Sequence, residues 1–273
     1  MMLISAILSI NILILGHSFA SDCTQNLPAI ALEAGMKDVR VGRFVKANCS
    51  LEEHWNYFQA DSTCFYSECA PGSKKFVRQE KSVRQVLEET EWDYIVFQNS
   101  LENEGRYETV QPFLDNLIEE FDIIAGENEH KKPVYCWNMF WPISKLLEDG
   151  SNSRATYRLS FYDNSSEKAF EAYKKTAARV VAETAVSRVI PVGLAIMDAR
   201  ASTYNTPEEK EFTRDGYHLS YAKGRWIAAS CWYQYFLAPV SGIDVCNLTL
   251  GSSLPDALKQ IASKAASVDV SQL

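Results

Sequence analysis

Short apolar runs alternate with amphipathic helical patterns along most of this chain of 273 residues. Continuous apolar runs are typical of strands that are buried on both faces of a parallel sheet. We therefore predict buried strands at Ile12–Leu15, Val39–Val45, Tyr94–Gln98, Val134–Trp137 and Arg188–Val192.

The segments between these runs show helical periodicity. The predicted helices are Asp22–Ala34, Ser50–Phe58, Val83–Glu89, Val110–Ile124, Glu167–Ala185 and Tyr221–Phe236. Strand and helix in alternation indicate right-handed parallel crossovers, so we expect an α/β fold: a three-layer helix–sheet–helix sandwich around a parallel sheet of roughly five strands. In such folds, ligands bind beyond the carboxyl ends of the strands.

Two polar segments, Asp61–Lys75 and Leu146–Ser166, are interpreted as connectors, and either could border a substrate. We expect one domain over residues 1–240, followed by a C-terminal extension over residues 241–273 that packs on the same domain or frays. Weak helical periodicity marks the extension around Leu254–Ala265.

The composition excludes some classes of partner. A formal charge of −8, with no run of Lys or Arg, argues against a nucleic-acid partner, because phosphate binding needs clustered cations. The seven cysteines lack the paired spacing of a zinc site, so we expect no metal and no cofactor. Cys64 and Cys69 could pair in a loop, although buried free thiols are the default.

The N-terminus has two interpretations. Met1–Leu15 is apolar enough for a secretory segment and Ser18-Phe19-Ala20 resembles a cleavage site, but no positive charge precedes them. We prefer to interpret Asn11–Leu15 as the first buried strand. The sequence as written then predicts a cytoplasmic protein, and a true start further upstream would make it periplasmic or secreted. No other segment has the length of a membrane span.

A candidate nucleophile follows the first strand, in Gly16-His17-Ser18-Phe19-Ala20-Ser21-Asp22. Gly16 allows a sharp turn that would present Ser18 at the edge of the sheet. The amide of Ser18 would then lie at a helix N-terminus, which favours the negative charge that develops on an attacked carbonyl. On this segment alone, an N-cap role for Ser18 or Ser21 is an equal alternative.

A candidate base lies in Arg214-Asp215-Gly216-Tyr217-His218, shortly before the last amphipathic helix of the main domain. With Gly between them, Asp215 can fold back to accept from His218 Nδ1 and leave Nε2 free toward a hydroxyl. Ordinary turn and cap roles are the alternatives. The chain has only three other histidines, His17, His54 and His130.

Together, these two segments resemble the first and last blocks of the SGNH (GDSL-like) serine hydrolases. Gly16-His17-Ser18 with Asp22 is similar to the first block, and Asp215-Gly216-Tyr217-His218 to the D-x-x-H block. The resemblance implies a flavodoxin-like SGNH fold and a catalytic triad of Ser18, Asp215 and His218.

The two middle blocks, which complete the oxyanion hole, depart from the SGNH pattern. Ala47-Asn48-Cys49 stands where a glycine is usual, so the backbone donor would be Asn48 or a neighbour, beside Ser18 itself. Gln98-Asn99-Ser100 replaces the usual Gly-x-Asn-Asp. Only one of two neighbouring side chains can face Ser18, and we favour Gln98, with Asn99 as its rival. A little-characterised SGNH branch has similarly altered blocks.

The resemblance implies a serine esterase that hydrolyses a short acyl ester, acetyl above all, on a small molecule or carbohydrate. Trp137, Asn138 and Trp141 follow the fourth predicted strand and could line the substrate pocket, with core packing as the alternative. Other candidate functions are a lipase or thioesterase of the same fold and a catalytically silent carbohydrate-binding module.

Overall fold

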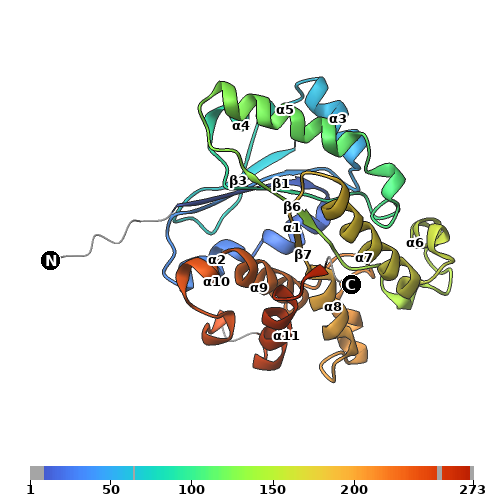
Figure 1. The fold of residues 1–273 in the computed structure, drawn as a ribbon. Helices are drawn as coiled ribbons and strands as arrows, with labels where there is room; N and C mark the ends of the chain where they lie inside the picture. Colours follow the sequence, from blue (N-terminus) through green and yellow to red (C-terminus); the bar gives the residue numbers. More distant parts are fainter. Residues whose placement is uncertain (1–8, 64, 251–253, 271–273) are drawn as a thin grey trace.

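The computed structural model describes residues 9–63, 65–250 and 254–270. Helices lie on both sides of a central sheet, and Figure 1 shows α3, α4 and α5 on one face and α1, α2, α8, α9 and α11 on the other. The strands are β1 (Ile10–Gly16), β2 (Val39–Val45), β3 (Tyr66–Cys69), β4 (Val77–Gln79), β5 (Tyr94–Phe97), β6 (Val134–Asn138) and β7 (Arg188–Ile190).

The described helices differ widely in length. The α-helices are α1 (Ser18–Thr24), α2 (Leu27–Glu33), α3 (Leu51–Gln59), α4 (Val83–Glu89), α5 (Phe113–Glu127), α6 (Ser153–Leu159), α7 (Ser166–Glu183), α8 (Val192–Ala201), α9 (Gly224–Phe236), α10 (Ala238–Ser241) and α11 (Asp256–Ala266). The 3-10 helices are η1 (Tyr107–Thr109), η2 (Lys145–Leu147), η3 (Ser160–Tyr162), η4 (Pro207–Phe212) and η5 (Val245–Asn247).

The sheet has the strand order β4-β3-β2-β1-β5-β6-β7. Strands β2, β1, β5, β6 and β7 are parallel, as predicted, whereas β3 and β4 extend one edge in antiparallel pairing. The predicted count of five strands is therefore wrong for the described residues, which form seven. These two strands were not predicted because neither is an apolar run: β3 contains Ser67 and Glu68, and all of edge strand β4 is exposed or partly exposed.

The core follows the predicted pattern. Leu13, Leu15, Val96 and Ile190 are completely buried, as expected for strands covered on both faces. Asn11–Leu15 lies within the central strand β1, and positions 1–8 of the alternative secretory segment lie outside the described residues. None of the described helices is long and apolar enough to cross a lipid bilayer.

Several helices depart from the predicted boundaries. The predicted helix Asp22–Ala34 is two helices, with Pro28 in the first turn of the second. Helix α6 lies inside the predicted connector Leu146–Ser166, and α8 starts directly after β7. In the C-terminal region, α11 packs against α8 and α9.

The strand order marks one point of the sheet where a ligand-binding crevice is expected. From β1 the chain continues to its neighbour β2, toward one edge of the sheet. From β5 it continues to β6, toward the opposite edge. Neighbouring parallel strands that lead in opposite directions leave a crevice at their carboxyl ends, where open α/β proteins bind ligands. Ser18 follows β1 and Gln98 follows β5, so both predicted segments lie at the carboxyl ends of these two strands.

Candidate active site

Ser18 is the first residue of α1, immediately beyond the turn that ends β1. The helix is N-capped by His17, whose Nδ1 accepts from the Phe19 amide at 3.3 Å. Neither Ser18 nor Ser21 is the cap, so the capping alternative for these serines is wrong. The Ser18 hydroxyl is half-buried and free to face the opposite loop.

That opposite loop is a tight hairpin closed by an isolated bridge between Thr213 and Leu219. The Arg214 amide donates to the His218 carbonyl at 2.9 Å, which brings the two sides of the hairpin together. Gly216 adopts a φ of 83°, and a Cβ at this position would lie 2.3 Å from Leu147 Cδ1. Glycine therefore meets both the backbone and the space requirement of this turn.

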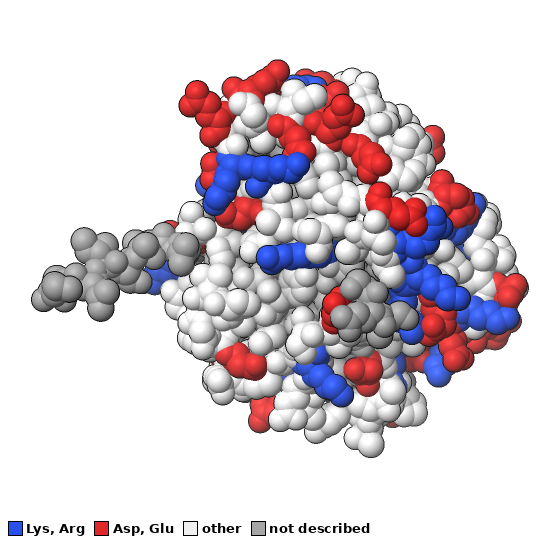
Figure 2. Space-filling view, in the orientation of Figure 1, with Lys and Arg blue, Asp and Glu red and all other residues white. Residues whose placement is uncertain are grey.

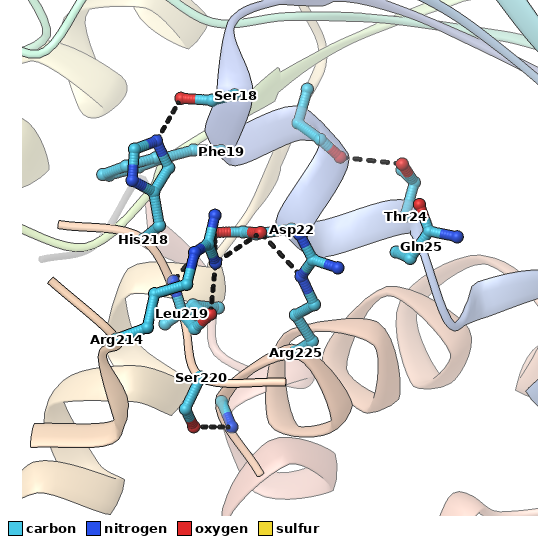
Figure 3. Close-up of polar contacts among 12 residues, drawn as sticks. Ser18, Phe19, Asp22, Thr24, Gln25, Arg214, His218, Leu219, Ser220 and Arg225 are labelled. Carbon is cyan, nitrogen blue, oxygen red and sulfur yellow. Dashed lines mark hydrogen bonds and ion pairs between the residues drawn. The ribbon is translucent and has the colours of Figure 1, made fainter. Parts of the chain in front are cut away.

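The hairpin directs His218 toward Ser18. His218 Nε2 lies 2.8 Å from Ser18 Oγ, and His218 Nδ1 lies 2.7 Å from Asp215 Oδ2. The second carboxylate oxygen, Asp215 Oδ1, accepts from the backbone amides of Tyr217 and His218 at 3.0 and 2.8 Å. Figure 3 shows the ring of His218 facing the Ser18 side chain at the start of α1.

The electrostatics around the site favour an ionised Asp215 and neutral rings at His17 and His54. Burial of the Asp215 carboxyl would raise its pKa, but the hydrogen bonds from His218 and Tyr217 outweigh this and hold the pKa below its usual value. Burial lowers the pKa of His17 far below its usual range and that of His54 to about 4. Both rings are therefore neutral near pH 7, and neither Nδ1 of His17 nor Nε2 of His54 is free, since each has a backbone partner.

Asn48, after β2, has a φ of 52°, in the left-handed region. This conformation suits glycine and, among other residues, Asn in particular, which explains how Asn occupies a position where a glycine was expected. Its side chain faces a neighbouring loop: Nδ2 donates to the Glu102 carboxylate at 2.9 Å and Oδ1 accepts from the Leu101 amide at 3.2 Å.

The two amides after β5 have different surroundings. Asn99 Oδ1 accepts from the amides of Leu51 and Ser100, at 3.2 and 2.9 Å, and Asn99 Nδ2 donates to Thr109 Oγ1 at 3.0 Å. Its side chain thus joins the start of α3 to η1. Gln98 is also completely buried, yet within the part of the chain that the structure describes its Nε2 has no hydrogen-bond partner.

A chain of donors fixes the orientation of Gln98. The indole of Trp232 can only donate, and it donates to Asn138 Oδ1 at 3.1 Å. Asn138 therefore presents Nδ2, which donates to Gln98 Oε1 at 3.0 Å. The remaining amide nitrogen of Gln98 lies beside Gly16, two residues before Ser18.

The three predicted substrate-lining residues are not in an open pocket. Trp137, Asn138 and Trp141 have no exposed surface. Trp137 donates to Glu104 at 3.1 Å, and Trp141 donates to the Tyr217 carbonyl at 2.8 Å. In this structure their side chains pack within the core, which favours the core-packing alternative for these residues.

Sequence reasoning missed several polar residues around the site. Ser100 has a buried hydroxyl with no hydrogen bond to any described residue, and buried Glu104 accepts from the Asn99 amide at 3.1 Å. Burial raises the pKa of Glu104 well above its usual value. Arg214 and Arg225 both bind Asp22, whose motif position was noted without a role. The one signal for Ser100 and Glu104 in the sequence is that both are polar residues shortly after the end of a predicted strand.

The comparison with known families concerns nearly the whole chain. A family described as "Domain of unknown function (DUF4886)" matches residues 11–268. The chain belongs to this family. The crystal structure of a DUF4886 family protein from Bacteroides uniformis ATCC 8492 has a TM-score of 0.77 to this DUF4886 domain, at 21% sequence identity, over 94% of this chain and 93% of that one. This similarity shows a shared fold.

A second solved structure, of a protein from Slackia heliotrinireducens described as a proposed SGNH hydrolase, has a TM-score of 0.49 at 17% identity, covering 81% of the DUF4886 chain and 96% of its own. No curated protein matches the chain.

The expected absence of a metal and the expected absence of a nucleic-acid partner both stay predictions. Over residues 9–63, 65–250 and 254–270, the DUF4886 domain has no group of three or more His, Cys, Asp or Glu that could hold a metal ion. On the face in Figure 2, acidic side chains gather at the top, over α4 and α5, and basic and acidic side chains are mixed at the right. Cys64 lies outside the described residues, and so does any pairing with Cys69.

Proposed function

We propose that this DUF4886 protein is a serine ester hydrolase of the SGNH type. The observation that carries the proposal is His218, whose two ring nitrogens lie 2.8 Å from Ser18 Oγ and 2.7 Å from Asp215 Oδ2. A hydroxyl, an imidazole and a carboxylate in this order form the relay that activates a serine nucleophile. The position of Ser18 at the carboxyl end of β1, where the order of connections reverses between β1 and β5, supports the same assignment.

The proposed reaction has two halves. Ser18 Oγ attacks the ester carbonyl while His218 Nε2 takes the hydroxyl proton, and His218 then gives this proton to the departing alcohol. In the second half, His218 removes a proton from water, the hydroxide attacks the acyl carbon, and the acid leaves as Ser18 regains its proton. Asp215 holds His218 in the tautomer with hydrogen on Nδ1.

The proposed oxyanion hole combines the Ser18 amide, at the start of α1, with Gln98 Nε2. Gln98 is favoured over Asn99 because its amide nitrogen has no hydrogen bond to any described residue, whereas Asn99 Nδ2 is bound to Thr109. A buried donor without a partner costs about 1–3 kcal/mol, and such a cost is expected where a group awaits a ligand. The backbone near Asn48 is the third proposed donor.

For the substrate, we propose a short acyl group, such as acetyl, on a polar alcohol such as a sugar. The side chains beside the hairpin are polar: Tyr217 Oη donates to Asn152 Oδ1 at 2.6 Å, and the Arg158 guanidinium lies 5.4 Å from the centre of the Tyr217 ring. Arg158 also approaches Glu102 at 3.6 Å. Polar groups at this border favour a hydroxylated leaving group over the long acyl chain of a lipase or thioesterase.

A fluorophosphonate probe and a graded ester series test the proposal. Wild-type protein should be labelled, and Ser18→Ala should not, because only an activated serine reacts with the probe. Acetylated sugars and p-nitrophenyl acetate should be hydrolysed faster than p-nitrophenyl octanoate. A preference for octanoate would indicate a lipase, and sugar binding without labelling or hydrolysis would indicate a silent carbohydrate-binding module.

A further inference from the structure

Asp22 is a completely buried carboxylate on the same helix as Ser18. The two residues are four positions apart, so they lie on the same side of α1, about one turn from each other. Among the described residues, the hydrogen bonds of the Asp22 carboxylate go to Arg214, Leu219 and Arg225, and none joins it to the side chains of the Ser18–His218–Asp215 relay. Its hydrogen bonds run to the segment that carries His218.

Three donors converge on the Asp22 carboxylate. Arg225 Nε donates to Oδ1 at 2.7 Å, Arg214 Nη1 lies 3.2 Å from the same oxygen, and the Leu219 amide donates to Oδ2 at 2.8 Å. Figure 3 shows Asp22 between the two arginine side chains, below Ser18 and His218. Each donor comes from a part of the chain about 200 residues away from α1.

These donors mark the base of the hairpin. Arg214 immediately precedes Asp215, and Leu219 immediately follows His218. Arg225 belongs to the first turn of α9, and its amide donates to the Ser220 carbonyl at 3.0 Å. One carboxylate thus binds both sides of the hairpin and the helix that follows it.

A buried carboxylate has no solvent to replace a lost partner, so this arrangement tolerates little displacement. Proton transfer between Ser18 and His218 requires a separation close to the hydrogen-bond distance, and a misplacement of about 1 Å can cost about 10²-fold in rate. The position of the hairpin relative to α1 therefore controls the reaction.

We propose that Asp22 is a positioning residue that sets the separation of Ser18 and His218 by binding both sides of the hairpin. This inference rests on the proposed hydrolase function. It predicts that Asp22 acts on the chemical step and not on substrate affinity.

The test replaces Asp22 by its neutral isostere. In Asp22→Asn, one amide oxygen can still accept from the Leu219 amide, but the amide nitrogen then faces guanidinium donors. We expect kcat to fall about 10²-fold with KM changed less than about three-fold. Fluorophosphonate labelling should slow in parallel, and hydrogen exchange in residues 213–220 should accelerate.

Glu68→Gln is the matched control. Glu68, on β3, is a second buried carboxylate with an Arg partner, Arg40, and a further donor, Tyr66 Oη at 2.6 Å. This variant should lose thermal stability without a fall in kcat or faster exchange in residues 213–220. If Asp22→Asn proves insoluble, Arg225→Gln removes one donor and should give a smaller change of the same kind in every measurement.

The outcomes separate this inference from the proposed function. A kcat for Asp22→Asn, or for Arg225→Gln in its place, that equals that of Glu68→Gln would overturn the positioning role, whatever the loss of stability. Faster exchange in residues 213–220 with an unchanged labelling rate would overturn it as well. If the wild type does not hydrolyse esters, and Ser18→Ala is labelled as strongly as the wild type, the proposed function itself fails and the inference fails with it.

Discussion

The side chain of Gln98 occupies the space next to Gly16 where any other residue would place its Cβ. A Cβ on residue 16 would lie 2.6 Å from both Cγ and Cδ of Gln98. Because Gln98 is completely buried and bound to Asn138 through Oε1, it has little room to withdraw. The absence of a side chain at position 16 therefore leaves the space that the Gln98 side chain occupies, and Gln98 Nε2 has no hydrogen-bond partner among the described residues.

Gly16→Ala should displace the Gln98 amide. We expect a loss of about 1–3 kcal/mol in the free energy of unfolding from overpacking, and a fall in kcat, because the proposed oxyanion donor moves. Denaturant unfolding and ester kinetics measure the two effects. Gly126→Ala is the control. Gly126 lies in helix α5, and a Cβ at this position would face open space. Full activity in Gly16→Ala would contradict the role given to the Gln98 amide.

Truncation of the two amides after β5 should have different effects. Gln98→Ala should lower kcat by about 10² to 10³ with KM little changed, because an oxyanion donor acts on charge that exists only in the transition state. Asn99→Ala should instead reduce stability, since it leaves the amides of Leu51 and Ser100 without their acceptor. Parallel kinetics and thermal unfolding of both variants check this, and an active Gln98→Ala would leave the hole to backbone amides.

The sequence predicted the parts of the fold and site that depend on local pattern. The five parallel strands are mostly apolar runs, and the turn at Gly216 follows from its residue types. Strands β3 and β4 could not be predicted in this way, because β3 contains two polar residues in four and the exposed edge strand β4 needs no apolar pattern. Helix α8 begins directly after β7 with few polar positions, so it could not be separated from the apolar run before it.

The contacts that join distant segments were beyond such reasoning. Asp22 and Arg225 are 203 positions apart, and no periodicity relates them. The burial of Trp137 and Trp141 likewise depends on packing against other elements, so their position after a strand could not distinguish a pocket wall from a core residue.

Asp215→Asn should retain the fold and lose most of the rate. Asp215 Oδ1 is held by the amides of Tyr217 and His218, so the new amide would keep its oxygen there and place its NH2 group against His218 Nδ1. This favours the wrong imidazole tautomer, for which a loss of kcat of up to about 10⁴ is known in a serine protease.

Steady-state kinetics and circular dichroism of Asp215→Asn give the two measurements, with Asp215→Ala as a comparison that leaves the tautomer free. A loss of less than about ten-fold in both variants would show that His218 is held by other contacts, without bearing on Ser18.

His54 should make the folded protein less stable at mildly acidic pH. Its ring is buried beneath the site, Nε2 lies 3.2 Å from the Gly16 carbonyl, and burial lowers its pKa from 6.5 to about 4. Between these two values the unfolded chain binds a proton that the folded protein does not, so the free energy of unfolding falls as the pH drops from about 6.5 to about 4. A difference of about 2.5 pKa units corresponds to about 3 kcal/mol for this group. Denaturant unfolding at several pH values from 7.5 to 4.5 should show this slope. His54→Gln, which keeps a donor for Gly16 but cannot titrate, should reduce it, and the part that remains comes from buried His17, whose pKa is lowered as well. The partly exposed His130, replaced by Gln, is the control, and an equal slope in the wild type and His54→Gln would show that His54 does not carry the effect.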